Sequence, residues 1–299
     1  MASRNILHMV TPLKHMSPFD VNMAIDAGYD SVIPYTQVTL EEIRGLVQDA
    51  IFSRAPDVGP RTALFIAGKN AIASLDMLHE ASEAFVPPFA LSVFADPAGS
   101  FTTAAAMVAC VAKTLKEKTG AGLTGKRVVV FGGTGVVGFS AAVLAATENA
   151  TVQLVGYDGD GRVKRSAADM QARFGVQVMG VDGSSEEKKR AIARDAEIIL
   201  CAGPAGAQVL SEVVISEAKS LIVAADVNAV PPPGIAGIGV FDNGTPLAGT
   251  PGVGIGALAI GNVKYQTESG LFRKMIESDK PLVLDFRDAY GLARQIVGA

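Results

Sequence analysis

Short hydrophobic runs alternate with longer segments of helical periodicity along most of this chain. Thr39 and Glu42 form a capping-box pattern ahead of apolar residues at helical spacing, which predicts a helix that begins near Leu40. Such an alternation of strands with helices is typical of a parallel α/β fold. In the first third of the chain, four hydrophobic runs predict buried strands at residues 6–10, 31–34, 63–66 and 90–94.

The alternation is most regular in the middle of the chain. It predicts strands at residues 127–131, 151–156, 176–181, 197–201 and 220–225, and helices at 135–148, 162–174 and 185–195. This order predicts a doubly wound parallel sheet of the Rossmann type. The expected fold class is therefore α/β, with that sheet, a smaller N-terminal α/β domain and a cleft between them.

Domain boundaries follow from a glycine-rich loop and from the C-terminal helices. A long helix expected at 102–118 precedes the loop 119–125, so we place the first boundary there. Residues 231–254 are rich in turn-forming residues and precede helices expected near 256–277 and 285–297, which we expect to cross back onto the first domain. The predicted domains are 1–122, 123–254 and 255–299.

Bulk composition narrows the classes of function. The 299 residues are 49% hydrophobic and 19% charged, with a formal net charge of −4, which fits a globular protein with room for two domains. No basic cluster is longer than Lys188–Arg190, so we expect no nucleic-acid surface. The uncharged runs 128–147 and 243–263 are broken by glycines, and the second also by prolines, so we expect no membrane contact.

Cysteine and histidine usage indicates a compartment and argues against a metal. Cys110 and Cys201 lie in apolar stretches, as expected of buried, reduced thiols in a cytoplasmic protein. The first residues lack the apolar segment of a secretory signal. Three scattered histidines and two cysteines have no familiar metal-ligand spacing, so no metal site is expected.

A glycine motif directly after the strand 127–131 predicts a dinucleotide site. Gly133, Gly135 and Gly138 give G-x-G-x-x-G at a strand-to-helix turn. We expect Gly133 to make the turn, Gly135 to let a pyrophosphate approach and Gly138 to let helix and strand pack. The helix N-terminus then offers free N–H groups to the phosphates, and the intervening Thr134, Val136 and Val137 complete the predicted loop. A glycine-rich turn without a ligand is the alternative.

Residues after the second strand of this unit predict which coenzyme binds. Tyr157 ends the strand and Asp158 follows it, where an acid can accept hydrogen bonds from ribose hydroxyls and favour NAD. Arg162, Lys164 and the adjacent Arg165 could neutralise a 2′-phosphate and favour NADP. We therefore expect both NAD and NADP as cofactors. The alternatives are a turn aspartate and a solvated basic helix face.

Two further strand ends are expected to contact the coenzyme. Ligands of open α/β sheets lie beyond the carboxyl ends of the strands. Small residues there would let a nicotinamide ribose lie against the backbone, although a plain turn is the alternative reading. The residues concerned are Ala202, Gly203 and Pro204 after one strand, and Asp226 and Asn228 at the end of the other.

Five stretches, spread over essentially the whole chain, have a combination of residues that is specific to one family. They are residues 11–22, 94–106, 130–138, 225–233 and 254–264. Together they resemble the bacterial NAD(P)-dependent methylene-tetrahydromethanopterin dehydrogenases of methylotrophs. The match looks closer to the variety that uses both NAD and NADP, because the strictly NADP-dependent variety typically has an arginine where this chain has Tyr157.

The resemblance implies a reaction and a substrate. Methylene-tetrahydromethanopterin would pass a hydride to NAD(P)+ and leave methenyl-tetrahydromethanopterin, in one-carbon metabolism and formaldehyde oxidation. Loss of hydride from a methylene between two nitrogens leaves a delocalised cation and moves no proton, so no general acid or base is required. The resemblance also implies that domain 1–122 binds the pterin. We further expect a cytoplasmic homo-oligomer.

Candidate catalytic residues come from the segments that carry the resemblance. Asp20 would stabilise the methenyl cation and Lys264 would orient the pterin, and we expect the two to meet across the cleft. For Asp20 the alternative is a helix-dipole partner, and for Lys264 a side chain that snorkels to solvent. The alternative for Ser100, Thr102 and Thr103 is helix capping. Those expected to bind substrate are Phe19, Asp96, Ser100, Thr102 and Thr103.

Three other functions remain open at this point. A methylene-tetrahydrofolate dehydrogenase would have a similar chain, but the Tyr-x-x-x-Lys pattern of the bifunctional folate enzymes is not found in the first domain. A non-catalytic NAD(P)-sensing protein would need the glycine motif without the polar N-terminal residues. A shikimate-dehydrogenase-like enzyme would need a Lys/Asp acid–base pair, which is not evident.

Overall fold

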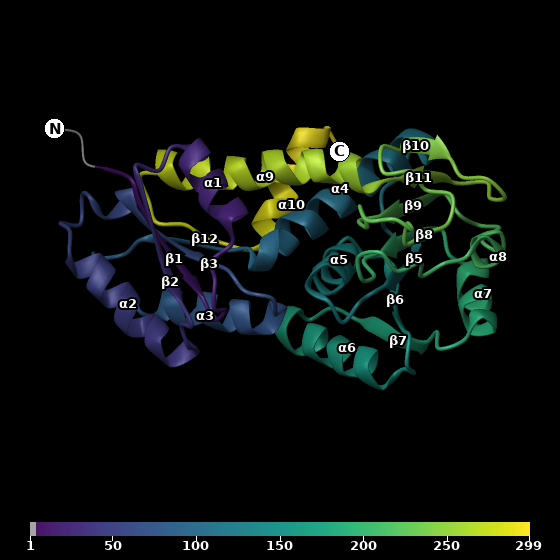
Figure 1. The fold of residues 1–299 in the computed structure, drawn as a ribbon, viewed down its shortest axis with the longest axis horizontal. Coiled ribbons are helices and arrows are strands. Elements are labelled where there is room, and N and C mark those ends of the chain that lie inside the picture. Colours follow the sequence, from purple (N-terminus) through teal and green to yellow (C-terminus); the bar gives the residue numbers. More distant parts are fainter. Residues whose placement is uncertain (1–3) are drawn as a thin grey trace. The chain divides into compact units, whose positions relative to one another are not determined.

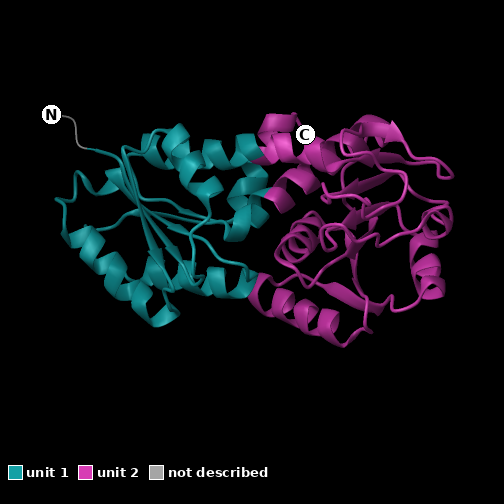
Figure 2. Cartoon of the chain, viewed as in Figure 1, with its two compact units in different colours: residues 1–102, 265–292 teal, residues 103–264, 293–299 magenta. Residues whose placement is uncertain are grey.

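The computed structural model describes residues 4–299, and the chain divides into two compact units (Figure 2). The first comprises Met1–Thr102 and Tyr265–Leu292, and the second Thr103–Lys264 and Ala293–Ala299. These divisions differ from the predicted boundaries at 122/123 and 254/255. Each structural division falls inside a long helix, where the sequence has no loop signal to mark it.

The first unit is built on a five-stranded parallel sheet (Figure 1). The strand order is β12-β4-β3-β1-β2, so the C-terminal segment adds an edge strand beside β4, with Val283 paired to Val93. All four strands predicted in this region are present, whereas the two-residue β12 was too short to leave a pattern. The strands are β1 (Ile6–Thr11), β2 (Ser31–Thr36), β3 (Thr62–Ile66), β4 (Ser92–Ala95) and β12 (Val283–Leu284).

Aromatic packing builds the core on one face of this sheet. Phe65 of β3 and Phe94 of β4 are paired in register, and both contact Phe272 of α9 (Ala257–Glu277) at ring-centroid distances of 5.3 and 5.5 Å. All three are completely buried, and burial of each ring stabilises the fold by about 1.5–3 kcal/mol. The residues on α9 therefore hold the C-terminal segment to the N-terminal strands within the first unit.

Helices α2 and α3 cover the other face of the first sheet (Figure 1). The capping box predicted for α2 is present, because the backbone N–H of Thr39 donates a hydrogen bond to Glu42 Oε2 at 2.7 Å. The helix before β2 begins with Ser17 as N-cap and a proline in its first turn. The bounds are α1 (Pro18–Ala27), α2 (Leu40–Phe52) and α3 (Ala71–Glu83).

The second unit has the strand order of a doubly wound fold. Its seven-stranded sheet runs β10-β11-β9-β8-β5-β6-β7, parallel except for the edge strand β10. The five predicted strands are present, but β10 and β11 were missed because they are short and contain glycine or proline. The strands are β5 (Arg127–Phe131), β6 (Thr151–Gly156), β7 (Val178–Asp182), β8 (Ile198–Cys201), β9 (Val223–Asp226), β10 (Asn243–Pro246) and β11 (Val253–Ile255).

Helices cover both faces of the second sheet, as the doubly wound pattern predicts. α5 and α6 lie on one face, and α7 and α8 on the other (Figure 1). The last helix, α10, is divided between the units: its residues up to Leu292 belong to the first unit, and those from Ala293 belong to the second. The bounds are α5 (Val136–Thr147), α6 (Gly161–Phe174), α7 (Glu186–Arg194), α8 (Glu212–Ile215) and α10 (Phe286–Val297).

One helical segment is long and apolar enough to cross a bilayer by length and composition. It is Pro97–Thr119, which contains α4 (Ser100–Thr119), and 78% of its most apolar window is buried inside the protein. The core helix of a globular protein passes the same test, so this segment is weak evidence for a membrane span. The uncharged runs 128–147 and 243–263 form strands, loops and helices, as predicted.

Candidate functional site

The glycine loop after β5 makes a turn that only glycine tolerates. Gly132 has φ +82°, and a Cβ atom there would collide with the backbone carbonyl of Ala202. The turn was predicted at Gly133, one residue later, and that assignment is corrected here. At Gly133 the constraint is instead steric, because a Cβ would lie 2.5 Å from Cδ2 of Leu154. The adjacent glycines made the two roles indistinguishable in the sequence.

The other two motif glycines differ in what surrounds them. A Cβ on Gly138 would collide with the carbonyl oxygen of Gly132, so this glycine permits close packing of α5 on the turn, as predicted. A Cβ on Gly135 would have only the Gly132 carbonyl within 4 Å, at 3.4 Å. Protein packing therefore does not require glycine at position 135. This leaves open backbone beside the N-terminus of α5, which has no side-chain cap.

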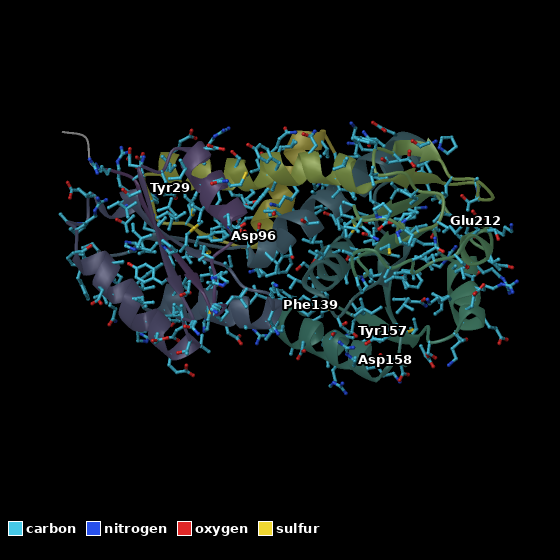
Figure 3. All side chains as sticks on the ribbon, in the orientation of Figure 1. Tyr29, Asp96, Phe139, Tyr157, Asp158 and Glu212 are labelled. Carbon is cyan, nitrogen blue, oxygen red and sulfur yellow. The ribbon has the colours of Figure 1, made fainter. Side chains whose placement is uncertain are left out.

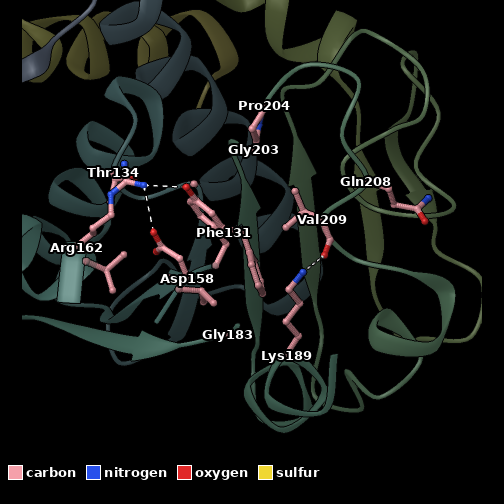
Figure 4. Close-up of a pocket in the computed structure, with 15 residues that line it drawn as sticks. Phe131, Thr134, Asp158, Arg162, Gly183, Lys189, Gly203, Pro204, Gln208 and Val209 are labelled. Atoms are coloured by element: carbon pink, nitrogen blue, oxygen red, sulfur yellow. Dashed lines mark hydrogen bonds and ion pairs between the residues drawn. The ribbon is translucent and has the colours of Figure 1, made fainter. Parts of the chain in front are cut away.

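A pocket of about 320 Å³ lies at the carboxyl ends of β5, β6 and β8, entirely within the second unit (Figure 4). Its lining is mostly apolar, with a few polar groups, which is typical of a site for a small organic ligand. Six of the residues predicted to bind the coenzyme line this pocket: Thr134, Tyr157, Asp158, Arg162, Gly203 and Pro204. Gly132, directly before the predicted motif, lines it as well.

Charged and aromatic side chains meet at one rim of the pocket. Arg162 Nη1 donates a hydrogen bond to the Tyr157 hydroxyl at 3.0 Å and lies 3.6 Å from Asp158 Oδ2 (Figure 4). The guanidinium carbon also lies 5.6 Å from the centre of the Tyr157 ring, within cation–π range. Tyr157 and Asp158 lie together where β6 meets α6 (Figure 3). This rim combines an acid and a base, as the sequence predicted.

Several lining residues were missed by the sequence analysis. Lys189 of α7 donates a hydrogen bond from Nζ to the Val209 carbonyl at 2.9 Å and closes the pocket on the side opposite Arg162 (Figure 4). Gly183 also lines the pocket, and its position requires glycine because a Cβ there would collide with Val155. A glycine directly after the third strand was a usable signal for Gly183. Gln208 and Val209 lie in a loop without any pattern to identify them.

Lys164, which was predicted to neutralise a 2′-phosphate, lies apart from this pocket. Its Nζ forms an ion pair with Asp160 at 2.5 Å, and its side chain lies against Gly180 of β7. It does not line the pocket, whereas Arg162, two residues earlier on the same helix, does. Helical geometry explains the difference, because residues two apart point to different sides of a helix.

Asp226 and Asn228 organise a loop beside the predicted coenzyme region. The buried Asp226 carboxylate accepts hydrogen bonds from the backbone N–H groups of Asn228 and Ile235, each at 3.0 Å. Asn228 Oδ1 accepts from Gly206 N at 3.2 Å, and Nδ2 donates to the Pro232 carbonyl at 2.9 Å. These two side chains therefore join the loops after β8 and β9, and neither lines the pocket described above.

Neither cysteine is a reactive thiolate at neutral pH. Burial and, to a smaller extent, the neighbouring Asp226 carboxylate raise the pKa of the Cys201 thiol to about 12. Burial likewise raises the pKa of Cys110 to about 11. Both are free and buried, as predicted. Within residues 4–299 there is also no group of three or more His, Cys, Asp or Glu side chains placed to hold a metal ion.

The substrate-binding candidates Asp96 and Thr102 bind each other. The Thr102 hydroxyl donates to Asp96 Oδ2 at 2.5 Å, and Asp96 Oδ1 accepts from the backbone N–H of Phe101 at 2.8 Å. These contacts support the capping interpretation of Thr102, and they show that Asp96 accepts hydrogen bonds at the same helix start. Ser100 begins α4, and Thr103 follows in its first turn.

The remaining candidates differ in exposure. Phe19 of α1 is 48% exposed, which is unusual for a phenylalanine, while the adjacent Asp20 is buried. Lys264 of α9 is also buried, which excludes the interpretation that it snorkels into solvent. Glu268, one helical turn after Lys264, is completely buried and was not among the predicted site residues. Its i+4 spacing from a singled-out lysine was an available signal.

The second unit fits a dinucleotide. Open backbone at Gly135 and the N–H groups at the start of α5 suit a pyrophosphate, and the apolar pocket between Val155 and Val209 suits an adenine ring. Asp158 and Arg162 stand where the adenosine ribose would lie in a doubly wound sheet. In this arrangement the lining residues would bind and orient the coenzyme.

Comparison with known proteins agrees with this geometry. A family described as methylene-tetrahydromethanopterin dehydrogenase, N-terminal, matches residues 18–98. The chain is 59% identical over 296 residues to the NAD(P)-dependent methylenetetrahydromethanopterin dehydrogenase of Methylorubrum extorquens, covering 99% of this chain and 100% of that protein. It is also 32% identical over 280 residues to the bifunctional protein MdtA of the same organism, covering 94% of each.

Solved structures share the fold at low sequence identity. The NAD-dependent malic enzyme of Thermotoga maritima has a TM-score of 0.57 at 13% identity, covering 97% of this chain and 84% of that one. The 5-ketofructose reductase of a Gluconobacter strain has a TM-score of 0.52 at 16% identity, covering 98% and 99%. These likenesses show the fold alone, whereas 59% identity along the full length shows the family. This chain belongs to the methylenetetrahydromethanopterin dehydrogenase family.

Proposed function

We propose that this protein oxidises methylene-tetrahydromethanopterin to methenyl-tetrahydromethanopterin with NAD(P)+ as hydride acceptor, in formaldehyde oxidation. The observation that carries the proposal is 59% identity, over both full lengths, to a relative named for this reaction. The glycine loop and the pocket beside Asp158 and Arg162 provide independent support for the coenzyme half of the proposal.

The reaction requires the protein mainly to position the pterin and the coenzyme. When bound, the nicotinamide accepts a hydride from the methylene carbon, and the positive charge left on the pterin is shared by two nitrogens. No proton moves, so the reaction requires neither a nucleophile nor a general acid or base. The chain must hold both ligands in register and exclude water from a product that hydrolyses.

Specific groups of this chain would hold the coenzyme. The N–H groups of Val136, Val137 and Gly138 begin α5 and would donate to the pyrophosphate, since the first N–H groups of a helix have no intrahelical acceptor. Thr134, Gly203 and Pro204 line the same pocket. Asp226 and Asn228 would act by fixing the loops around it, and Ala202 by its backbone contact with the Gly132 turn.

For the pterin we propose Asp20 and Lys264 as catalytic residues. A buried carboxylate would stabilise the cation as it forms, and a buried ammonium would orient the pterin through a hydrogen bond. Phe19 is a further candidate for substrate binding, because its half-exposed ring offers an aromatic face to a planar ligand. Ser100 and Thr103 are further candidates at the start of α4.

The cellular setting is also part of the proposal. We propose a cytoplasmic homo-oligomer that binds neither membrane nor nucleic acid. The two buried, free cysteines are compatible with a reducing compartment. Fractionation of the native host and light scattering of the purified protein would test location and assembly.

The decisive experiment is a turnover assay with four substrate pairs. Purified protein is mixed with methylene-tetrahydromethanopterin or methylene-tetrahydrofolate and with NAD+ or NADP+, and formation of the reduced coenzyme is followed by absorbance. We expect turnover with the methanopterin substrate and both coenzymes. Turnover with the folate alone would make the protein a folate enzyme. Coenzyme binding without turnover on either pterin would indicate a sensor.

A further inference from the structure

Arg162 has three contacts at the ribose rim of the pocket, and they differ in strength. Its Nη1 is hydrogen-bonded to the Tyr157 hydroxyl at 3.0 Å, and its guanidinium carbon lies 5.6 Å from the centre of that ring. Its distance to Asp158 Oδ2 is 3.6 Å, too long for a hydrogen bond. The tyrosine is therefore the anchor of the guanidinium, and the aspartate is a looser partner.

The looser partner is easily exchanged. The Arg162 and Asp158 side chains are 46% and 43% exposed, and half-exposed ion pairs contribute little stability. A dianionic phosphate group offers stronger charge-assisted hydrogen bonds to an arginine than a single distant carboxylate oxygen does. The guanidinium can therefore change its anionic partner while the contact with Tyr157 keeps it at the pocket rim.

We propose that Arg162 is the residue that lets one site take both coenzymes, by alternating between Asp158 and a coenzyme 2′-phosphate. With NAD, Arg162 stays on Asp158 and the carboxylate accepts the free ribose hydroxyls. With NADP, Arg162 moves to the 2′-phosphate and offsets the repulsion between that phosphate and Asp158. This inference rests on the proposed NAD(P) site and adds the residue that selects between the coenzymes.

The neighbouring bases do not have the same freedom. Lys164 is already paired with Asp160 at 2.5 Å and lies against β7, away from the pocket lining. Lys189 lines the opposite side and donates to the Val209 carbonyl. Among the basic side chains described in this unit, Arg162 is the one that combines a place in the lining with an exchangeable anionic partner.

The test uses coenzyme fragments, so that it needs neither pterin nor hydride transfer. Isothermal calorimetry of the full chain measures binding of 2′,5′-ADP, which carries the 2′-phosphate, and of 5′-AMP, which does not. Arg162→Leu should weaken 2′,5′-ADP by about tenfold or more and change 5′-AMP by less than about twofold. Lys219→Leu removes the same charge from an exposed site elsewhere in the unit, and should change neither.

Two further variants separate alternation from simple charge. Asp158→Asn should strengthen 2′,5′-ADP and weaken 5′-AMP, but in an Arg162→Leu background its effect on 2′,5′-ADP should differ by about threefold or more, because paired residues are not additive. Tyr157→Leu removes both the hydrogen bond and the ring contact and should weaken binding of 2′,5′-ADP, whereas Tyr157→Phe removes the hydrogen bond alone and should weaken it less.

Three outcomes would overturn the inference. They are equal losses for both fragments in Arg162→Leu, a loss in Lys164→Leu as large as that in Arg162→Leu, or strict additivity of the Asp158 and Arg162 changes. A failed turnover assay with methylene-tetrahydromethanopterin would overturn the proposed function and leave these fragment affinities standing. The two failures are therefore distinguishable.

Discussion

The Thr102 hydroxyl donates a hydrogen bond to Asp96 Oδ2 across 2.5 Å, and both side chains are buried. Asp96 Oδ1 accepts from the backbone N–H groups of Phe101 and Thr102, so one carboxylate satisfies donors at the start of α4. From the sequence, the position of Thr102 at a helix start suggested substrate binding as readily as helix capping. The geometry supports a structural role for this pair.

Thr102→Val should therefore destabilise the protein without changing its binding of the pterin substrate. The substitution keeps the shape of the side chain and removes the hydroxyl donor, at an expected cost of about 1–3 kcal/mol in the free energy of unfolding. Urea denaturation measures the loss, and steady-state kinetics should show an unchanged KM for the methylene-pterin. A raised KM with normal stability would return Thr102 to the substrate site.

Gly135→Val and Gly138→Val should fail for different reasons. At position 135 the backbone has open space, so the variant should fold and lose coenzyme affinity because the side chain occupies the pyrophosphate position. At position 138 a Cβ collides with the Gly132 carbonyl, so the variant should lose stability itself, by about 1–3 kcal/mol or more.

Calorimetric titration with NAD+ and thermal denaturation distinguish the two variants. Gly135→Val should show a near-normal melting temperature and no measurable binding, and Gly138→Val a lowered melting temperature. Retained NAD+ affinity in Gly135→Val would mean that the loop is only a structural turn. The pair thus separates the ligand-facing glycine from the packing glycine in one motif.

Asp226 should make the protein less stable as the pH rises through the mildly acidic range. Burial raises the pKa of this carboxyl above its ordinary value of 3.8, while backbone N–H donors such as those of Asn228 and Ile235 oppose the shift. A carboxyl with a raised folded-state pKa binds more protons in the folded than in the unfolded protein. Its contribution to stability is therefore lost as pH rises above about 4.

Asp226→Asn removes this titration and one acceptor. The variant should be less stable than the wild type, and the gap between their free energies of unfolding should narrow between pH 4 and pH 7. Urea denaturation across that range measures the gap, with the exposed Asp57→Asn as a control. A gap that widens with pH would show that Asp226 is stabilised as the carboxylate.

Local sequence signals predicted the longer parallel strands of both units and missed the short ones. β5 and β6 match the predicted bounds because β-branched runs ending in glycine have few alternative structures. β10 and β12 were missed, because a strand of Asn-Gly-Thr-Pro and a strand of two residues depend on their neighbours for pairing. The unit divisions were displaced because α4 and α9 run through them.

Site residues could be predicted from the sequence where a position requires glycine or places a charged side chain just after a strand. Gly138, Asp158 and Arg162 have the surroundings that the motif implied. The sequence could not separate Arg162 from Lys164, since that depends on which side of α6 faces the pocket. It also could not identify Gln208, which reaches the pocket from a loop whose path is set by tertiary contacts.

Asp20 and Lys264 carry the last prediction. Both lie in segments that carry the family resemblance, and both are buried, where solvent screens the charge of a side chain only weakly. If Asp20 stabilises the methenyl cation and Lys264 orients the pterin, each loses one charge-assisted hydrogen bond on substitution. That loss is worth about 1.5–3 kcal/mol, or roughly ten- to a hundredfold in rate.

Asp20→Asn and Lys264→Met should accordingly each lower kcat/KM for the methylene-pterin by at least about tenfold. The dissociation constant of NAD+ should stay within about twofold of the wild type, since neither residue lines the coenzyme pocket. Lys274→Met, an exposed lysine on the same helix, serves as the control and should behave as wild type. Circular dichroism establishes that each variant is folded. Near-normal kcat/KM in both folded variants would remove Asp20 and Lys264 from the catalytic machinery and assign their burial to structure alone.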